Sequence, residues 1–138
     1  MDRDKAIQIT FFLLRVVAGL MFMQAGGMKI LGWLGGSPGG TPAMWSQMWI
    51  GGMLELIGGA MILVGFLTRP VAFIVAGQMA VAYWQFHYKA EAFWPVQNGG
   101  VPAVLYCFIF LFIAAFGAGR WSLDSMIWGK RAGNSPES

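Results

Sequence analysis

The chain contains a single cysteine, Cys107, and a single histidine, His87, among its 138 residues. One cysteine excludes an intrachain disulfide and a CxxC redox pair. Metal and haem centres are usually built from several His or Cys ligands, so no metal site is expected within this chain. Any cofactor would therefore be an associated molecule rather than an intrinsic prosthetic group.

Charged residues are also scarce, at 11% of the sequence, whereas soluble domains contain about 25%. Hydrophobic residues make up 57% of the chain, and the mean hydropathy is +0.61. The net charge of +3 arises from few residues and bears on membrane topology rather than on nucleic-acid binding, which we do not expect. The composition predicts an integral membrane protein whose main partner is the lipid bilayer.

Four apolar windows are long enough to cross a hydrocarbon core of about 30 Å, which takes about 20 residues. They cover approximately residues 7–31, 48–67, 70–88 and 101–116. The tight connection at Thr68 and Arg69 predicts that the second and third windows form an antiparallel hairpin. The expected fold is all-α, an integral membrane four-helix bundle that forms one domain over residues 1–138.

The basic residues predict the orientation of this bundle. Six of them fall at one predicted end, namely Arg3, Lys5, Arg69, Arg120, Lys130 and Arg131. Two fall at the other end, namely Lys29 and Lys89. Because basic residues are retained on the cytoplasmic side, both termini are expected in the cytoplasm.

Two of the predicted helices carry a stripe of small residues that also includes charged side chains. The first stripe is Arg15, Gly19, Phe22, Gly26 and Lys29, and the second is Gly51, Glu55, Gly58, Ile62 and Gly65. Small residues at this spacing let two helix backbones approach closely in lipid. We therefore expect the stripes to face each other, with Gly19, Gly26, Gly51 and Gly58 as structural contacts.

Arg15 and Glu55 are expected to neutralise each other, since an ion at the bilayer centre costs at least ~2.5–3.5 kcal/mol. At ~1.5 Å per residue the two lie roughly a third of the bilayer apart in height, so a bridging group is a second possibility. Gln78 and Gln85 share one face of the third predicted helix and are candidates for that bridge. The pair could be a purely structural clasp, or it could bind a headgroup or a proton.

Aromatic and polar residues gather at the outer end of the third predicted helix and in the loop after it. They include Tyr83, Trp84, His87 and Asn98. Side chains of this kind commonly anchor a protein at the membrane–water interface. The alternative is a site for a quinone ring, with His87 as hydrogen-bond donor or acceptor and Glu55 near it in depth.

Several motifs occur in order along most of the chain. They are R-x3-G-x2-F-x3-G-x2-K from Arg15 to Lys29, the block GGMLELIGGAMILVGFLTR, His87 with the loop residue Asn98, and the closing GAGRWSLD. Together these motifs resemble the DoxX family of membrane proteins. The chain departs from the family pattern at Ala25, where many members have histidine, and at Val101-Pro102, where many have glutamate.

The resemblance implies a link to membrane oxidoreductase assemblies, one relative being the quinone-facing subunit of a thiosulfate:quinone oxidoreductase. We expect an accessory or anchoring subunit of a quinone-linked redox complex in a bacterial or archaeal cytoplasmic membrane. The expected quinone or polar-ligand contacts are Glu55, Arg15 and His87, while Gln78, Gln85 and Asn98 are expected to be structural. Electrons would come from a larger complex or a soluble redox partner, because no flavin, haem or cluster motif is present.

Other interpretations stay open at this point. The chain could be a structural or assembly subunit with no ligand chemistry, and a homo-oligomer is compatible with the sequence. A small transporter is less favoured because no inverted repeat is present. Catalysis by this chain alone is not expected, since no nucleophile and base stand out as a pair.

Overall fold

The computed structural model of the protein describes residues 2–132, and its regular elements in that range are helices, which confirms the all-α class. The long helices are α1 (Arg3–Ile30), α2 (Gln47–Val64), α3 (Thr68–Ala82) and α5 (Val101–Phe116). The shorter elements are η1 (Trp33–Gly35), η2 (Tyr83–His87), α4 (Pro95–Asn98) and α6 (Leu123–Ala132). An isolated bridge pairs Lys89 with Ala92.

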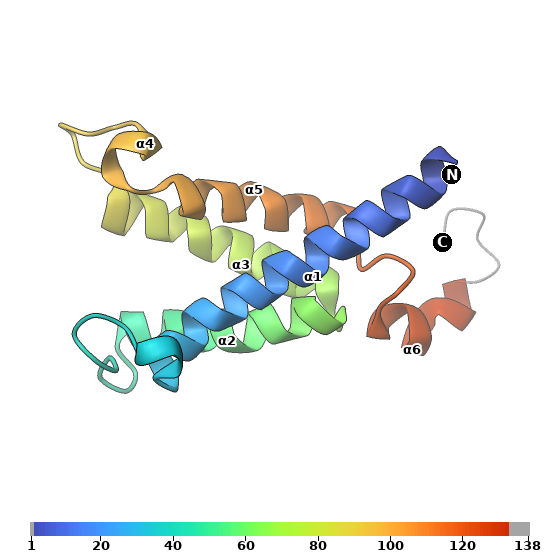
Figure 1. Cartoon of the computed structure of the whole chain (residues 1–138), viewed down its shortest axis with the longest axis horizontal. Coiled ribbons are helices and arrows are strands. Elements are labelled where there is room, and N and C mark those ends of the chain that lie inside the picture. Colours follow the sequence, from blue (N-terminus) through green and yellow to red (C-terminus); the bar gives the residue numbers. More distant parts are fainter. Residues whose placement is uncertain (1, 133–138) are drawn as a thin grey trace.

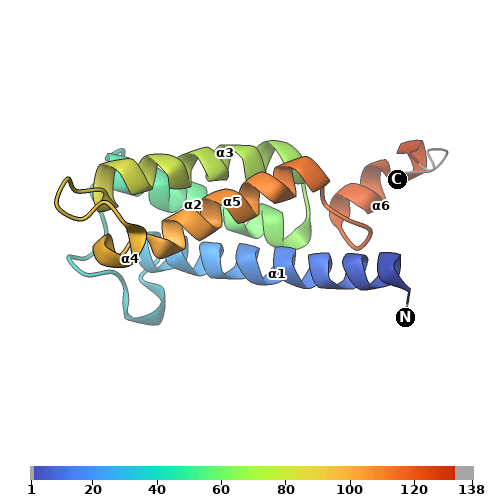
Figure 2. The ribbon, with the colours of Figure 1, turned by 90° about the horizontal axis from the view of Figure 1, so that it is seen from above.

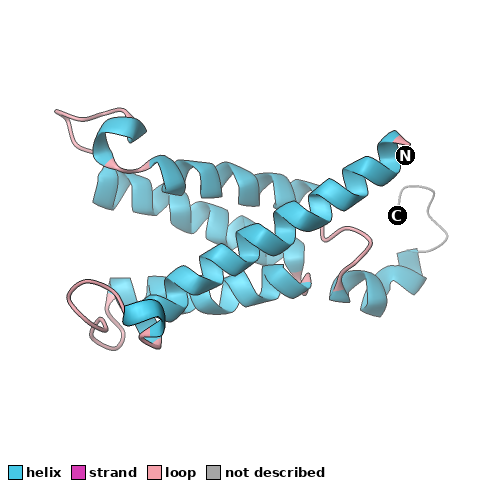
Figure 3. Cartoon of the chain, viewed as in Figure 1, coloured by secondary structure: helices cyan, strands magenta, loops and turns pink. Residues whose placement is uncertain are grey.

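The four long helices run side by side along the long axis of the molecule (Figure 1). Helix α1 packs mainly on α2, and α3 packs mainly on α5, while the α2–α3 contact is smaller. The start of α1, the α2–α3 turn and α6 lie at one end, and the α1–α2 loop and α4 lie at the other (Figures 1 and 2). Most of the described ribbon is helix, with loops confined to the connections (Figure 3).

The helix ends follow local capping rules. The Asp2 carboxylate accepts the Lys5 N–H at 2.7 Å at the start of α1, and the Ser46 hydroxyl accepts the Trp49 N–H at 3.2 Å at the start of α2. Helix α2 ends at Gly65, whose φ of +75° is the left-handed conformation that glycine adopts without strain. Pro102 occupies the first turn of α5, where a missing N–H costs nothing.

Helix α3 continues directly into the π-helix η2, so the helical path runs from Thr68 to His87. This explains why the third predicted window extends to residue 88 although α3 itself ends at Ala82. A π-turn inserts one extra residue per turn and changes which side chains share a face, and such turns are frequent at functional sites. Here the π-turn lies at the loop end of α3, among aromatic side chains.

Helices α1 and α2 are long and apolar enough to cross a membrane, and α5 is a shorter apolar helix. Large apolar side chains cover the outside of the bundle rather than its interior alone. Those at least half exposed on the long helices include Leu13, Met21, Ile57, Phe73, Phe108 and Phe112. So much outward apolar surface would be a liability in water and suits a lipid environment.

The α1–α2 interface is a close backbone crossing. A Cβ at Gly19 would lie 2.9 Å from the carbonyl oxygen of Gly59, and a Cβ at Gly26 would collide with the Gly52 carbonyl and the Leu56 amide. The prediction that Gly19 and Gly26 face α2 is therefore confirmed.

The prediction that Gly51 and Gly58 of α2 face α1 is wrong. Gly51 and Gly58 face α3 instead, where a Cβ would meet the Gln78 amide at 3.3 Å and a Val75 methyl at 2.9 Å. The reason lies in the doublets of adjacent glycines in this helix: the second glycine of each doublet contacts α1, and the first contacts α3. Helix α2 thus has two smooth faces and is approached from both sides.

Candidate functional site

Glu55 is a buried acid whose partner is a lysine. The Lys29 ammonium donates to both carboxylate oxygens of Glu55, at 2.9 and 2.8 Å. The Glu55 side chain is only 7% exposed, whereas the Lys29 side chain is 26% exposed. The two side chains form an ion pair between the end of α1 and the middle of α2.

The expected pairing of Arg15 with Glu55 is wrong. The Arg15 guanidinium is 2% exposed and donates to the carbonyl oxygens of Ala118, of Trp121 at 2.9 Å, and of Leu63 at 3.4 Å. Its carbon atom lies 5.4 Å from the centre of the Phe12 ring. Arg15 is therefore held by backbone carbonyls from the end of α2 and from the connection between α5 and α6.

Depth explains the correct partner of Glu55. Arg15 and Glu55 lie at different heights, whereas Lys29 shares the Arg15 stripe one turn beyond Gly26. In a helix each Cα–Cβ bond leans toward the N-terminus, so a lysine in the last turn of α1 reaches back toward the middle of the bundle. Lys29 was expected at the outer membrane surface, and the signal that could have identified it was its place on the same stripe at the depth of Glu55.

The closing motif GAGRWSLD forms a separate polar network at the other end. The Asp124 carboxylate accepts the N–H groups of Leu67 at 2.8 Å and Thr68 at 2.9 Å, so it caps the start of α3 from α6. The Asp124 N–H in turn donates to the Gly65 carbonyl at 2.8 Å. Together with Arg15, these contacts fasten the α2–α3 turn to the segment before α6.

Neither glutamine bridges Arg15 and Glu55. Gln78 donates to the carbonyl oxygen of Gly51 at 3.1 Å, one turn along α2 from Glu55. Its amide oxygen is buried and has no hydrogen-bond partner in the described part of the chain. Gln85 accepts a hydrogen bond from the Gln47 side chain. Both glutamines therefore connect α3 and its extension to α2, and neither forms a hydrogen bond with Arg15 or Glu55 in the described part of the chain.

The residues near η2 hold the loop that follows it. Asn98 donates to the Ala92 carbonyl at 3.0 Å and to the Tyr83 hydroxyl at 3.2 Å, and its side-chain oxygen accepts the Gly100 N–H at 2.8 Å. These contacts support a structural role for Asn98. His87 is half-buried in η2 and takes no part in the ion pair of Glu55.

Tyr106 from α5 packs against Phe22, which lies on the α1 stripe that ends at Lys29. Its ring stacks on Phe110 with centroids 5.5 Å apart and lies 5.4 Å from the Phe22 ring. All four long helices thus bring a polar side chain to this half of the bundle, with Gln78 contributed by α3.

This site can form a hydrogen bond to a ligand through the Lys29 ammonium, whose charge is balanced by Glu55. A lysine ammonium has three N–H donors, and the two contacts formed in the structure both go to Glu55. The third donor is free of Glu55, and the Lys29 side chain is 26% exposed. Such a site suits a ligand with a hydrogen-bond acceptor on a planar ring.

Comparison with known proteins gives the chain its family. The model of the DoxX family matches residues 10–88, which include the Lys29–Glu55 pair. The chain belongs to the DoxX family. It is also 36% identical over 120 residues to an uncharacterized protein of Haemophilus influenzae (strain ATCC 51907 / DSM 11121 / KW20 / Rd), a match that covers 85% of this chain and 90% of the relative. No solved structure matches it significantly. The family and the apolar helices α1 and α2 indicate a membrane protein.

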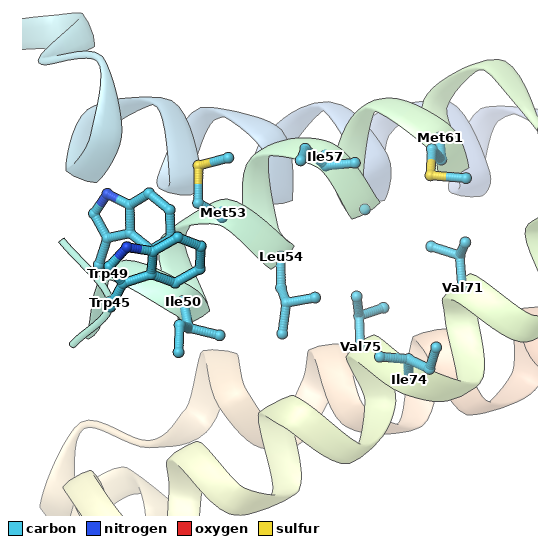
Figure 4. A pocket seen from close by; sticks show the side chains of 11 residues that line it. Trp45, Trp49, Ile50, Met53, Leu54, Ile57, Met61, Val71, Ile74 and Val75 are labelled. Carbon is cyan, nitrogen blue, oxygen red and sulfur yellow. The ribbon is translucent and has the colours of Figure 1, made fainter. Parts of the chain in front are cut away.

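This DoxX protein also has an apolar groove of about 410 Å³ between α2 and α3 (Figure 4). Its walls are Trp45, Trp49, Ile50, Met53, Leu54, Ile57, Gly58, Met61, Val71, Ile74 and Val75. The two indoles stand together at one end, with ring centroids 4.9 Å apart. The groove lies on the α3 side of α2, whereas Glu55 points to α1, so it adds apolar surface rather than chemistry to the polar site.

Proposed function

We propose that this DoxX protein is an accessory membrane subunit of a quinone-linked redox complex, and that the Lys29–Glu55 pair with Tyr106 contacts the quinone ring. The observation that carries the proposal is the ion pair itself, in which Glu55 is buried and one ammonium donor of Lys29 is free of Glu55. Ionisable residues inside a membrane usually mark a functional site. Arg15 leaves the set of ligand contacts because its hydrogen bonds go to backbone carbonyls.

A quinone matches this site in shape and polarity. Its ring is flat and can lie against the partly exposed Tyr106 ring, and its carbonyl oxygen can accept a hydrogen bond from the Lys29 ammonium. The Glu55 carboxylate fixes the position of the ammonium through two short contacts. The chain supplies binding and orientation, and a partner protein of the complex supplies the electrons.

We further propose that four helical segments cross the membrane: α1, α2, α3 with η2, and α5. The direction of the chain supports this topology, because the start of α1, the α2–α3 turn and α6 lie at the same end of the bundle (Figure 1). That end carries six of the eight basic residues considered for topology, so it faces the cytoplasm. The bacterial relative supports a bacterial cytoplasmic membrane.

A purely structural or assembly subunit is the second candidate. The observation that favours it is the saturation of both Glu55 oxygens by Lys29, which is also what a clasp between two helices requires. The clasp needs no ligand, whereas the quinone site needs an accessible Lys29 donor. The two functions therefore predict different quinone affinities for a variant in which both side chains of the pair are made neutral.

The test is quinone titration of the whole protein in nanodiscs, with a short-chain ubiquinone analogue as probe. The Lys29→Gln/Glu55→Gln variant leaves no unpaired charge, and Lys89→Gln removes a lysine outside the pair as control. Loss of the charged donor should weaken binding about tenfold or more, since a hydrogen bond to a charged group contributes about 1.5–3 kcal/mol. Equal affinity of the wild type and the paired variant would favour the structural subunit instead.

A further inference from the structure

Helix α6 is attached to the bundle at one side only. Asp124 in its first turn binds the N–H groups of Leu67 and Thr68, and Trp128 stacks on Phe66 with ring centroids 6.1 Å apart. The helix follows α5 after the six residues 117–122 and projects from the end of the bundle at which α1 begins (Figures 1 and 2). These contacts fix its position at that end of the bundle.

The opposite side of α6 is apolar and exposed. Leu123, Met126 and Ile127 follow one another at steps of three and one, which places them on a single helical face. Their exposed fractions are 38%, 75% and 52%. Within the described residues, these three side chains form no hydrogen bond or ring stacking like those of Asp124 and Trp128.

The charges around α6 are mainly positive. Arg120 precedes the helix, and Lys130 and Arg131 lie in its last turn. The acid of α6, Asp124, is engaged as the cap of α3. The exposed Arg69 at the start of α3 adds another positive charge at this end.

From this arrangement we infer that α6 is an interfacial helix that lies in the headgroup region of an anionic lipid leaflet. Basic residues lie at both ends of the apolar face, with Arg120 before the helix and Lys130 one turn beyond Met126. Apolar side chains at the acyl boundary with Lys and Arg beside them are the pattern of helices that bind membrane surfaces. Charge complementarity selects the partner, because a basic segment beside the membrane is attracted by phosphatidylglycerol-like headgroups. The bilayer surface is also the nearest apolar medium to a helix tethered six residues from α5.

The test places an environment-sensitive fluorophore on the Met126→Cys variant of the full chain, in a Cys107→Ala background. Ser125→Cys is the matched control, because the neighbouring position is turned about 100° around the helix. Both are reconstituted in nanodiscs of phosphatidylcholine and phosphatidylglycerol. Quenching is then measured with each lipid in turn carrying a spin label near its headgroup, at equal content.

The expected result is stronger quenching at position 126 than at 125, and stronger quenching by spin-labelled phosphatidylglycerol than by phosphatidylcholine. The ratio of quenching by phosphatidylglycerol to quenching by phosphatidylcholine should fall toward one when Arg120→Gln, Lys130→Gln and Arg131→Gln are combined. Each basic residue near an anionic surface strengthens binding about fivefold. Lys89→Gln, at the opposite end, should leave the preference unchanged. Equal quenching at both positions, or quenching of the probe at position 126 by aqueous iodide in nanodiscs, would overturn the inference.

Protection from iodide only after addition of a soluble protein would overturn it too, and would mark α6 as a protein-docking helix.

Discussion

At the scale of single residues, Arg15 and Lys29 lie in opposite halves of helix α1 and serve different networks. Arg15 satisfies carbonyl groups at the end of the bundle where α6 begins, and Lys29 neutralises Glu55 in the other half. The sequence predicted that Arg15 and Glu55 would be buried. It could not show which group pairs with each, because the spacing of residues along a helix shows which way a side chain points but not how far it reaches. The number of free carbonyls around Arg15 depends on the path of residues 117–122, which no local pattern of the chain reveals.

A double-mutant cycle on Lys29 and Glu55 tests this separation. Lys29→Met alone should lower the free energy of unfolding by about 3–5 kcal/mol, because it leaves a buried carboxylate without its partner. The combination of Lys29→Met with Glu55→Gln should cost less than Lys29→Met alone. Reversible unfolding in mixed detergent micelles measures each term.

The matched control is the cycle of Arg15→Met with Glu55→Gln. These two substitutions should add, because the side chains belong to different networks and share no hydrogen-bond partner. Strong coupling in this second cycle, with none between Lys29 and Glu55, would show that the pairing described above is wrong.

At the scale of the elements, the apolar windows gave the long helices to within a few residues, apart from the continuation of α3 as η2. Windows of apolar residues locate helices because a span must satisfy its own backbone hydrogen bonds in lipid. Which face of α2 packs against α1 was harder to predict. Adjacent glycines at 51 and 52, and again at 58 and 59, leave two smooth faces, so spacing alone could not decide which one meets α1.

Gly26→Ala should destabilise the bundle by about 1–3 kcal/mol, the usual cost of adding a methyl group to a close-packed site. The new Cβ would collide with the backbone of Gly52 and Leu56, which cannot move without separating α1 from α2. The control is Gly77→Ala on the exposed side of α3, where a Cβ meets nothing within 4 Å. That variant should be neutral or more stable by up to about 1 kcal/mol. Thermal unfolding in the same detergent compares them, and equal effects at the two sites would contradict the close crossing.

At the scale of the whole molecule, the chain forms two helix pairs joined by the tight α2–α3 turn. Family membership could be predicted from motif order and is confirmed by the match over residues 10–88. One domain over residues 1–138 and four membrane crossings stay predictions. Packing of the chain on itself determines which ends lie together, whereas the side of the membrane depends on charges that act during insertion.

The proposed topology predicts which positions react from each side of the membrane. Single cysteines in a Cys107→Ala background at Asp4 and Ser125 should react with a membrane-impermeant maleimide only from the cytoplasmic face. Cysteines at Ser37 and Glu91 should react only from the opposite face, because the α1–α2 loop and the loop before α4 lie at the other end of the bundle. Reaction of Asp4→Cys and Ser37→Cys from the same face would exclude the crossing of α1.

The most direct measurement of the central claim is the location of bound quinone by photolabelling. An azidoquinone irradiated with the protein in nanodiscs, followed by peptide mapping, should label the end of α1 near Lys29 and the part of α5 near Tyr106. Excess unlabelled quinone should remove that label, and Lys29→Gln/Glu55→Gln should reduce it. Saturable labelling confined to the Arg15 network, or labelling that excess quinone does not displace, would contradict the account.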